Sequence, residues 1–540
     1  MAPPSGDATI HKLYQQKQWA KVVRLAEAAP SRGTEEDFDY GMALAHLERW
    51  SDARKALIAG HHLCPGDRRF PVELAGVAFQ QKQYPEAASW LHIALRLDPH
   101  DQYALNFAGS VYYLMGNLNA ALKYWNQLQK PYVATFEPDT QLKLQRRILD
   151  RAFAFAPASV MGCEQFSATE ARLQALGIYP VYNIGLRARP DGTFDAEFHA
   201  LERDGFGSNR WQAIIATLGG LPYETVYPAY FNAGHVGLNI QSLLRWDAEK
   251  ERAWAAVDAP LHGLPQWHWQ IATDERAENW TLRRSFTGAA PSLGSLHLTR
   301  ETGAATLTSI QSGRTEWSMG FEASHRAFRD IVEGSALNPS LTSGGMQTKY
   351  VASIDEKLID IPERRFTART GATSELARLW SNPPRLYEKL QSDARINWLP
   401  QAIGDKYELQ QRVRAGTTFG HAPFDELWML GVERDNSLWL RGLLGTRDGR
   451  KGSAPLAHRY FLSNSDFDRR IYSNGLITIK AGPLLDIGRA AAPTAGLAPQ
   501  RWLFTAGAKA KVTVFGIGAV FTYGRDLRSG TNAFFATVAQ

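Results

Sequence analysis

From Tyr407 to Gln540 the chain alternates between apolar and polar residues, and this pattern limits the fold more than any other feature of the sequence. Residues two apart in a β-strand share a face of the sheet. In Tyr407–Phe419 the apolar residues fall on one face, and Glu408, Arg412 and Arg414 fall on the other. Two arginines and a glutamate would be costly in hydrocarbon, so this face must meet water or a polar interior. The pattern therefore predicts a closed β-barrel whose apolar face lies in lipid.

Other segments divide in the same way. Leu476–Gly488 places Asp486 on its polar face, and Val512–Tyr523 is predicted as one strand with Phe515, Ile517, Phe521 and Tyr523 on the apolar face. Upstream strands are predicted at Trp211–Thr217, Glu224–Asn232, Gly237–Trp246, Ala253–Ala259, Trp267–Thr273 and Arg365–Thr370. About 330 residues, at roughly ten per strand plus loops, suit about 16 strands. A soluble β-sandwich or propeller with buried aromatic residues is the alternative.

The composition of the chain limits which binding partners and which cellular compartment can be predicted. The net charge is +6, from 60 Lys and Arg against 54 Asp and Glu, which is too small to predict nucleic-acid binding. No apolar run approaches the ~18 residues that a membrane helix needs. Met1-Ala2-Pro3-Pro4 shows neither the basic nor the apolar region of a signal peptide, so export is an inference. Cys64 and Cys163 lie far apart, which predicts neither a disulfide framework nor a zinc site.

The N-terminal quarter of the chain repeats with a period of about 34 residues. Large residues recur at Trp19, Trp50, Tyr84 and Leu118, compact ones follow at Val22, Ala53, Ala87 and Ala121, and prolines stand at Pro30, Pro65 and Pro99. A small residue lets two helices approach closely, and proline cannot continue the second helix. The pattern resembles the tetratricopeptide repeat. That resemblance implies packing roles for Trp19, Trp50, Ala53, Tyr84, Ala87 and Ala121, and a groove for a protein or peptide.

Residues 136–205 change character. Helices are predicted at Gln141–Phe153 and Ala168–Leu176, followed by a hairpin of Pro180–Arg187 and Thr193–Glu202. The turn signal is Arg189-Pro190-Asp191-Gly192. Helix and hairpin before a barrel are similar to the polypeptide-transport-associated module. That module is built β-α-α-β-β, and its first strand is not evident in this sequence.

Two short motifs in the C-terminal region carry a more specific resemblance. Leu440-Arg441-Gly442 lies in a long basic loop, and Leu484-Leu485-Asp486-Ile487-Gly488 lies on a later strand. Their order resembles the bacterial surface-antigen barrel superfamily, which includes BamA, TamA and FhaC-type transporters. The resemblance implies that the loop folds back into the barrel and that Arg441 and Gly442 meet Asp486 and Gly488 as a lock. The chain departs from the family pattern at Leu484 and Leu443, where aromatic residues are usual, and at its end, Phe534–Gln540, which has no terminal aromatic residue.

Motifs of other chemistry are incomplete. Gly445–Ser453 lacks the contiguous Gly-Lys-Ser/Thr of a phosphate loop and is predicted to form the basic body of the barrel loop, with Arg447, Asp448 and Arg450 available for ion pairs. Glu433-Arg434-Asp435 stands beside a turn and is predicted as a solvated loop. No serine-hydrolase elbow is present. We therefore expect no catalytic residue, no metal site and no cofactor.

The expected fold is α+β and multidomain: a tetratricopeptide α-solenoid over 1–135, a transport-associated-like module over 136–205, and an outer-membrane β-barrel of about 16 strands over 206–540. The resemblance implies a non-enzymatic protein that inserts or exports proteins, or lipids, with periplasmic repeats recruiting partners. Its expected partners are outer-membrane lipid and a protein or peptide in the repeat groove, without nucleic acid. A membrane-anchored scaffold without transport is the alternative, and an enzyme built on a soluble β domain is a third reading.

Overall fold

The computed structural model of the chain describes residues 6–283, 292–332, 337–474, 476–492, 496–499, 501–514 and 517–539. It divides into two compact units. One comprises residues 1–132 with 159–163, and the other comprises 133–158 with 164–540. The predicted features of Met1–Pro4, Phe515 and Gln540 lie outside the described residues.

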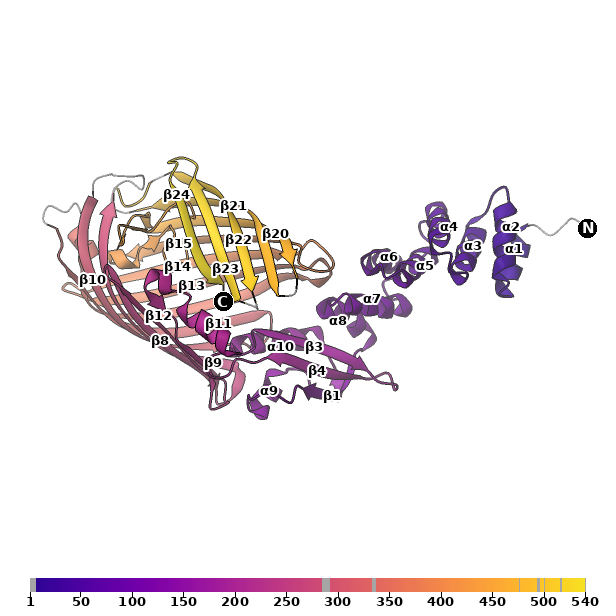
Figure 1. Cartoon of the computed structure of the whole chain (residues 1–540), viewed down its shortest axis with the longest axis horizontal. Helices are drawn as coiled ribbons and strands as arrows, with labels where there is room; N and C mark the ends of the chain where they lie inside the picture. Colours follow the sequence, from indigo (N-terminus) through magenta and orange to yellow (C-terminus); the bar gives the residue numbers. More distant parts are fainter. Residues whose placement is uncertain are drawn as a thin grey trace, which may run out of the picture. The chain divides into compact units, whose positions relative to one another are not determined.

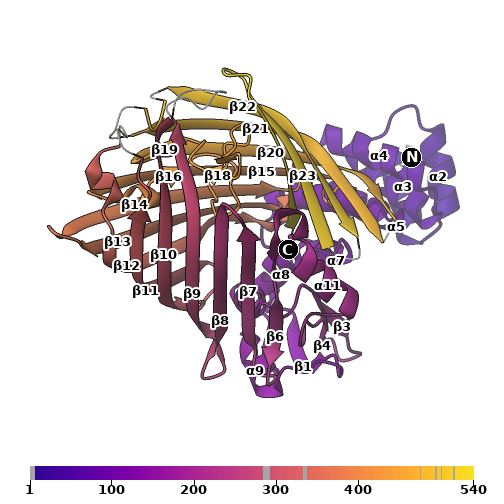
Figure 2. The same ribbon diagram turned by 60° about the vertical axis from the view of Figure 1, so that its left-hand side comes forward.

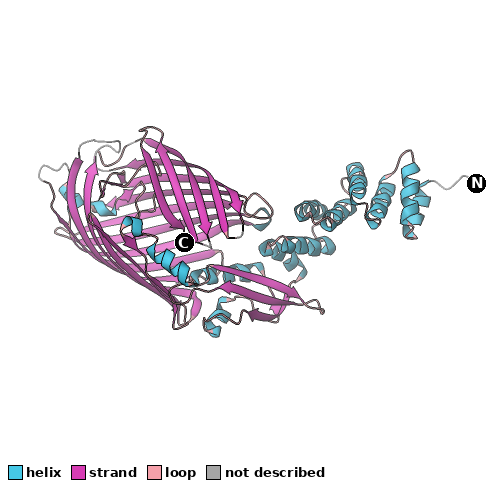
Figure 3. Cartoon of the chain, viewed as in Figure 1, coloured by secondary structure: helices cyan, strands magenta, loops and turns pink. Residues whose placement is uncertain are grey.

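The first unit is built of short helices in succession. They are α1 (Gly6–Gln15), α2 (Trp19–Ala28), α3 (Thr34–His46), α4 (Trp50–Leu63), α5 (Arg69–Gln80), α6 (Tyr84–Leu97), α7 (Gln102–Leu114) and α8 (Leu118–Trp125), with a 3₁₀ turn, η1 (Asn126–Leu128). In Figure 3 the part of this unit from α1 to η1 is drawn as helices joined by loops. The large residue of each repeat opens α2, α4, α6 and α8, and each proline of the pattern follows the end of a helix.

Small residues of this unit lie where helices touch. A Cβ added at Gly41 would lie 2.7 Å from Leu57, and one added at Gly109 would lie 2.3 Å from Trp125. Trp19 stacks on His46 with ring centroids 4.2 Å apart. Ala53, Ala87 and Ala121 are fully buried. The repeat positions thus contribute to packing between neighbouring helices.

A small α/β module follows, and it contains the strand that the sequence did not reveal. Its elements are β1 (Tyr132–Pro138), α9 (Arg146–Ala152), β2 (Ser159–Val160), α10 (Cys163–Leu176), β3 (Val181–Ala188) and β4 (Phe194–Leu201). β1 runs parallel to β4, and β4 runs antiparallel to β3. β1 was missed because it is short and follows Pro131 directly, with little alternation. It also spans the domain boundary that we predicted at 135/136.

Contacts from this module reach one end of the large sheet. Gln145 donates its backbone N–H to the carbonyl of His235 at 2.8 Å, and Arg172 donates to the carbonyl of Gln311 at 3.2 Å. His235 lies in the turn between β6 and β7, and Gln311 lies in the turn between β10 and β11. The module therefore covers this end of the sheet.

The rest of the chain forms one large antiparallel sheet that curves round on itself (Figures 1 and 2). Its strands are β5 (Thr225–Val226), β6 (Ala229–Ala233), β7 (Leu238–Asp247), β8 (Lys250–Leu261), β9 (Leu264–Arg283), β10 (Ser292–Ser309), β11 (Thr315–Arg329), β12 (Gly345–Ile361), β13 (Phe366–Trp380), β14 (Arg385–Trp398), β15 (Tyr407–Gly420), β20 (Arg459–Ser473), β21 (Ile477–Ala491), β22 (Trp502–Val514), β23 (Ile517–Asp526) and β24 (Asn532–Ala539). Short helices are α11 (Arg210–Leu218), η2 (Leu221–Tyr223), η3 (Pro339–Thr342) and η4 (Pro362–Arg364).

We call this curved sheet the wall. Its described strands occupy fifteen positions. β5 and β6 share one position because both pair with β7, nine positions run from β7 to β15, and five run from β20 to β24. In the order of strands around the sheet, β24 is followed by β5. Among the described residues, however, no backbone pairing links β24 to β5. Since successive strands alternate in direction, the first and the fifteenth positions run the same way. The count is close to the predicted number of about 16.

Two strand predictions are wrong. Trp211–Thr217 lies in α11, because its apolar residues also fit a helical spacing and the Asn209 side chain caps the helix, accepting from the Gln212 N–H at 2.8 Å. Val512–Tyr523 is a hairpin in which β22 ends at Val514 and β23 begins at Ile517, and these two residues pair. Apolar and polar residues keep alternating in the sequence from one strand to the next, so periodicity alone did not reveal the break.

The two faces of the sheet differ in chemistry. Arg252, Lys349 and Asp486 lie on the inner face, which is rich in ion pairs. Large apolar side chains such as Tyr350 and Ile354 are exposed on the other face. Among the described helices, none has the length and apolar character needed to cross a membrane.

We predict that Gly109→Ala destabilises the helical unit by about 1–3 kcal/mol, because the new methyl group would overlap Trp125. Trp125 cannot yield easily, since its indole N–H donates to the carbonyl of Asn106 at 3.2 Å. Urea unfolding followed by circular dichroism measures the change. Gly76→Ala is the matched control, because only a side-chain atom 3.9 Å away faces it, and it should be neutral or stabilising. Equal destabilisation by both changes would contradict the close approach of α7 and α8.

Candidate functional site: a loop inside the sheet

The long connection between β15 and β20, residues 421–458, lies against the inner face of the sheet, and we call it the inner loop. It contains η5 (Phe424–Glu426), β16 (Trp428–Met429), β17 (Thr446–Arg447), β18 (Arg450–Lys451) and β19 (Leu456–Ala457). β16 pairs with β19, and β17 pairs with β18. The Asn436 side chain donates to the carbonyls of Met429 and Gly431, each at 2.8 Å. The loop therefore has a defined fold of its own.

Apolar side chains of the inner loop pack on the wall. Leu430, Leu438, Leu440 and Leu443 are buried in a cluster with Leu462, Ala490 and Leu503 of the strands. Trp439 contacts Phe535 of β24 with ring centroids 5.2 Å apart. Burial of these side chains favours the inward position of the loop.

Arg441 lies at the tip of the inner loop and binds two carboxylates of the wall. Its Nη2 lies 2.5 Å from Asp486 Oδ1 on β21, and its backbone N–H donates to Asp486 Oδ2 at 2.8 Å. Its Nη1 donates to Asp466 on β20 at 2.6 Å. Asn464 also donates to Asp486, at 2.7 Å. The Asp486 side chain is fully buried, so nearly all of its hydrogen bonding comes from this cluster.

Glycines allow the tip to approach the wall. A Cβ on Gly442 would lie 2.5 Å from the backbone nitrogen of Asp526, and a Cβ on Gly524 would lie 2.2 Å from the carbonyl oxygen of Arg441. One on Gly488 would lie 3.0 Å from Leu440. The four residues predicted as a lock, Arg441, Gly442, Asp486 and Gly488, thus come together in space.

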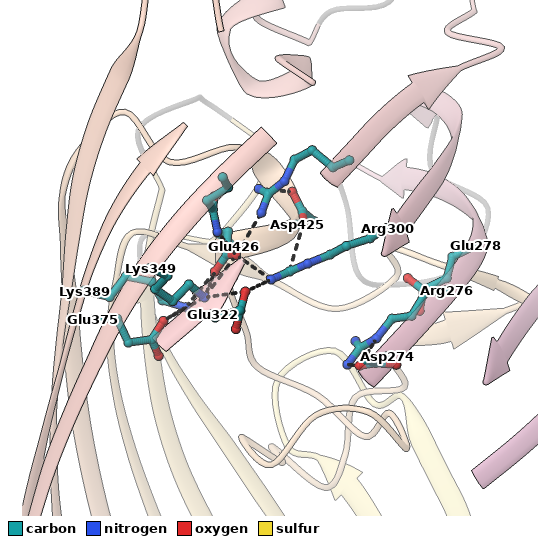
Figure 4. A network of polar contacts seen from close by, with 12 residues as sticks. Asp274, Arg276, Glu278, Arg300, Glu322, Lys349, Glu375, Lys389, Asp425 and Glu426 are labelled. Atoms are coloured by element: carbon teal, nitrogen blue, oxygen red, sulfur yellow. Dashed lines mark hydrogen bonds and ion pairs between the residues drawn. The ribbon is translucent and has the colours of Figure 1, made fainter. Parts of the chain in front are cut away.

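A second cluster surrounds Glu426 of η5 and is drawn in Figure 4. Its carboxylate lies 3.1 Å from Arg326, 3.2 Å from Lys349 and 3.4 Å from Lys389, on three different strands. Arg300 bridges Glu426 and Asp425 at 3.1 and 3.3 Å. Several cations around one buried carboxylate compensate its loss of hydration.

A third cluster surrounds Asp435. Its carboxylate accepts from Arg245 on β7 at 2.9 Å, from Arg252 on β8 at 2.6 Å and from Lys451 on β18 at 2.9 Å. Lys451 also bonds Glu278 of β9, the strand with which β18 makes a parallel bridge. The inner loop is thus bound to the wall at three places. At one of them Arg441 of the loop binds carboxylates of the wall, and at the other two Glu426 and Asp435 of the loop bind cations of the wall.

The prediction of a solvated loop at Glu433-Arg434-Asp435 is wrong. The Glu433 and Asp435 side chains are each 3% exposed. The partners Arg245 and Arg252 lie 190 and 183 positions earlier in the chain, so local sequence could not show them. Glu426 was missed as well, although its place between apolar residues Phe424 and Leu427 is a signal that could have found it.

The charged residues of the basic segment Gly445–Ser453 lie partly in solvent and partly in the interior. Arg450 pairs with Glu249 at 3.0 Å near the surface, and the Asp448 side chain is 78% exposed. Lys451, which was not among the predicted ion-pairing residues, is a buried cation.

Metal-ligating side chains come together at one place in the described residues: His11, Glu35 and Asp39 of the helical unit, with ligand atoms within 4.8 Å of one another. Glu35 already accepts two hydrogen bonds from Arg69, at 2.7 and 3.0 Å. The arrangement is explained by ion pairing within the helices.

Comparison with known proteins gives similar structures without a matching sequence family. No family model matches the chain, and no curated protein matches it. Similar solved structures are BamA from Haemophilus ducreyi lacking POTRA domains 1–3 (10% identity, 76% of this chain and 84% of that chain, TM-score 0.43), CdiB from Escherichia coli (13%, 76% and 75%, 0.49) and CdiB from Acinetobacter baumannii (10%, 82% and 81%, 0.45). The function is therefore argued from this chain's own residues.

We predict that Asp435→Asn lowers the free energy of unfolding by about 3–5 kcal/mol, because it leaves three buried cations without their shared carboxylate. Urea unfolding of the purified protein, followed by tryptophan fluorescence, measures the change. Asp448→Asn removes the same charge from an exposed position of the same loop and should change stability by less than about 0.5 kcal/mol. Equal unfolding midpoints for the two variants would show that the Asp435 cluster does not hold the loop.

Proposed function

We propose that residues 206–540 form a β-barrel in an outer membrane, and that the protein inserts or exports proteins, or lipids, there. The observation that carries the proposal is the contrast between the faces of the sheet. Large apolar side chains are exposed at outward positions on many strands, including Leu244, Ile271, Met319, Phe321, Tyr350, Ile354, Leu376, Leu390, Phe467, Leu485, Phe521 and Phe534. Apolar surface of this extent is unusual on a soluble monomer and is expected on a wall that faces hydrocarbon.

The inner face supports a role in passage rather than in anchoring alone. A barrel used only as an anchor would need no organised loop inside it. Here the inner loop carries buried charges and is held by the clusters of Arg441, Glu426 and Asp435. We propose that it closes the interior and that the pairing of Arg441 with Asp486 acts as its lock.

A polar cavity lies at the end of the sheet that the α/β module contacts. It has a volume of about 680 Å³ and is lined by α10 and by the inner face of β11–β15, with Asp355, Arg369, Asp393 and Arg412 among its charged residues. We propose that a polar segment of cargo enters here.

The N-terminal helices are proposed to act as a tetratricopeptide array over 1–135 in the periplasm, with the transport-associated-like module at 136–205 joining it to the barrel. Helices that begin at the repeat positions and pack through Ala53, Ala87 and Ala121 support this assignment. The groove of such an array suits a protein or peptide partner. No nucleic acid, cofactor or catalytic role is proposed.

Conductance across a planar lipid bilayer tests the proposal. We expect the wild-type protein to stay mostly closed, and Arg441→Ala and Asp486→Ala to raise the open fraction at least about tenfold, the ratio that 1.4 kcal/mol supplies. Asp448→Ala is the matched control and should stay closed. Both lock variants are first checked for a folded yield comparable to that of the control.

Deletion of residues 1–132 separates the transporter from the scaffold. When the deletion is combined with Arg441→Ala, a transporter keeps the conductance of that variant, since the proposed pore belongs to the second unit. If neither the full chain, the lock variants nor the deletion conducts ions, the barrel is only an anchor, and the scaffold function is favoured.

A further inference from the structure

The segment before β5 occupies the edge of the wall. Gly205 and Phe231 exchange backbone hydrogen bonds at 2.9 and 2.6 Å, and the Tyr227 N–H donates to the carbonyl of Thr217 at 2.9 Å. Residue numbers rise along this segment while those of its partners fall, so it runs antiparallel to β5–β6. The opposite edge of β5–β6 is taken by β7. α11 therefore lies on the side where the strand order returns to β24.

The position of α11 accounts for the odd number of strand positions in the wall. Antiparallel closure needs an even number of strands, and the described wall has an odd number. One more antiparallel segment beside β5–β6 would complete the series, and α11 with its flanking residues stands in that place. Figure 2 shows α11 beside β6, near the mark of the C-terminus.

One side of α11 faces the interior. Gln212, Ala213, Ala216 and Thr217 line a cavity of about 360 Å³, together with Gln241 and Leu243 of β7 and Arg252 and Trp254 of β8. Arg252 belongs to the inner face, because it binds Asp435 of the inner loop. This side of the helix is mostly small or polar.

The other side of α11 is apolar and exposed. Trp211, Ile214, Ile215 and Leu218 form a stripe at helical spacing, with exposures of 76, 49, 47 and 42%. We call these four residues the α11 stripe. A tryptophan with three quarters of its surface exposed is unusual in water.

The α11 stripe continues the apolar outer surface of the sheet. Phe206, just before the helix, contacts Tyr230 of β6 with ring centroids 5.2 Å apart. Tyr230 pairs with Ile240 of β7, and both are exposed on the outer face. Across the place where the strand order passes from β24 to β5, β24 exposes Phe534. Apolar surface thus lies on both sides of α11.

We infer that α11 is a wall element that closes the seam between β5–β6 and β24, and that its stripe is covered by the acyl chains of the bilayer. The inference rests on the proposed membrane location of the barrel. A helix satisfies its own backbone hydrogen bonds, so it can face hydrocarbon without a ladder to β24. Side-chain packing then replaces backbone pairing at this one place in the wall.

Site-specific fluorescence in lipid nanodiscs tests the inference with the full chain. Cys64 and Cys163 are replaced by serine, and single cysteines are introduced as Ile214→Cys, Gln212→Cys and Leu376→Cys, then labelled with an environment-sensitive dye. Position 376 reports the outer face of β13, and position 212 reports the inward side of the same helix as 214. Quenching by lipids that carry a spin label on the acyl chain is compared with quenching by iodide in water.

We expect labels at 214 and 376 to be quenched several-fold more by the spin-labelled lipid than by iodide, and the label at 212 to show the reverse. If 376 meets lipid but 214 is quenched by iodide, α11 is an aqueous helix and the inference fails while the membrane barrel stands. If 214 is protected from both quenchers, a protein surface covers the stripe, which also overturns the inference. If 376 itself is quenched by iodide, the proposed membrane location fails.

Discussion

The structure depends on the pairing of buried charges between the inner loop and the wall. Asp486, Glu426 and Asp435 are removed from water, and each would be strongly unfavourable without its cations. Glu426 and Asp435 of the loop each meet cations from several strands, and Asp486 of β21 meets Arg441 of the loop, so the loop and the wall fix each other's positions. A loop held in this way has one defined conformation, and breaking any one cluster leaves charges without partners.

The same division of polarity governs the rest of the second unit. Alternation along each strand sends charges inward and large apolar residues outward, which suits hydrocarbon outside and a filled polar interior. α11 shows the same division of polarity, but with the period of a helix. Its small and polar side faces the inner cavity, and its apolar stripe faces away from it. The α/β module contacts the turns at one end of the sheet, where α10 lines a polar cavity.

The sequence predicted what local periodicity controls. Period-two alternation located part or all of β6–β9, β13, β15 and β21 and placed Asp486 on the polar face, but it did not locate β10–β12, β14 or β20. The large residues at the 34-residue spacing, Trp19, Trp50, Tyr84 and Leu118, begin helices. Trp211–Thr217 was misread because its isoleucines suit both a strand and a helix, and only the cap at Asn209 favours the helix. The partners of Asp435 could not be predicted, since they come from strands nearly 200 residues away. β1 was hidden because pairing with the distant β4, rather than its own pattern, makes it a strand.

The most direct test of the account is heat-modifiability in detergent. The protein is extracted with detergent and run on SDS gels with and without boiling. A barrel closed by α11 and filled by the pinned loop should resist SDS at room temperature, so that the unboiled protein migrates differently from the boiled one and is found only in the detergent fraction. Identical mobility, with protein soluble in plain buffer, would contradict the membrane barrel and favour a soluble sheet with an apolar surface covered by another protein.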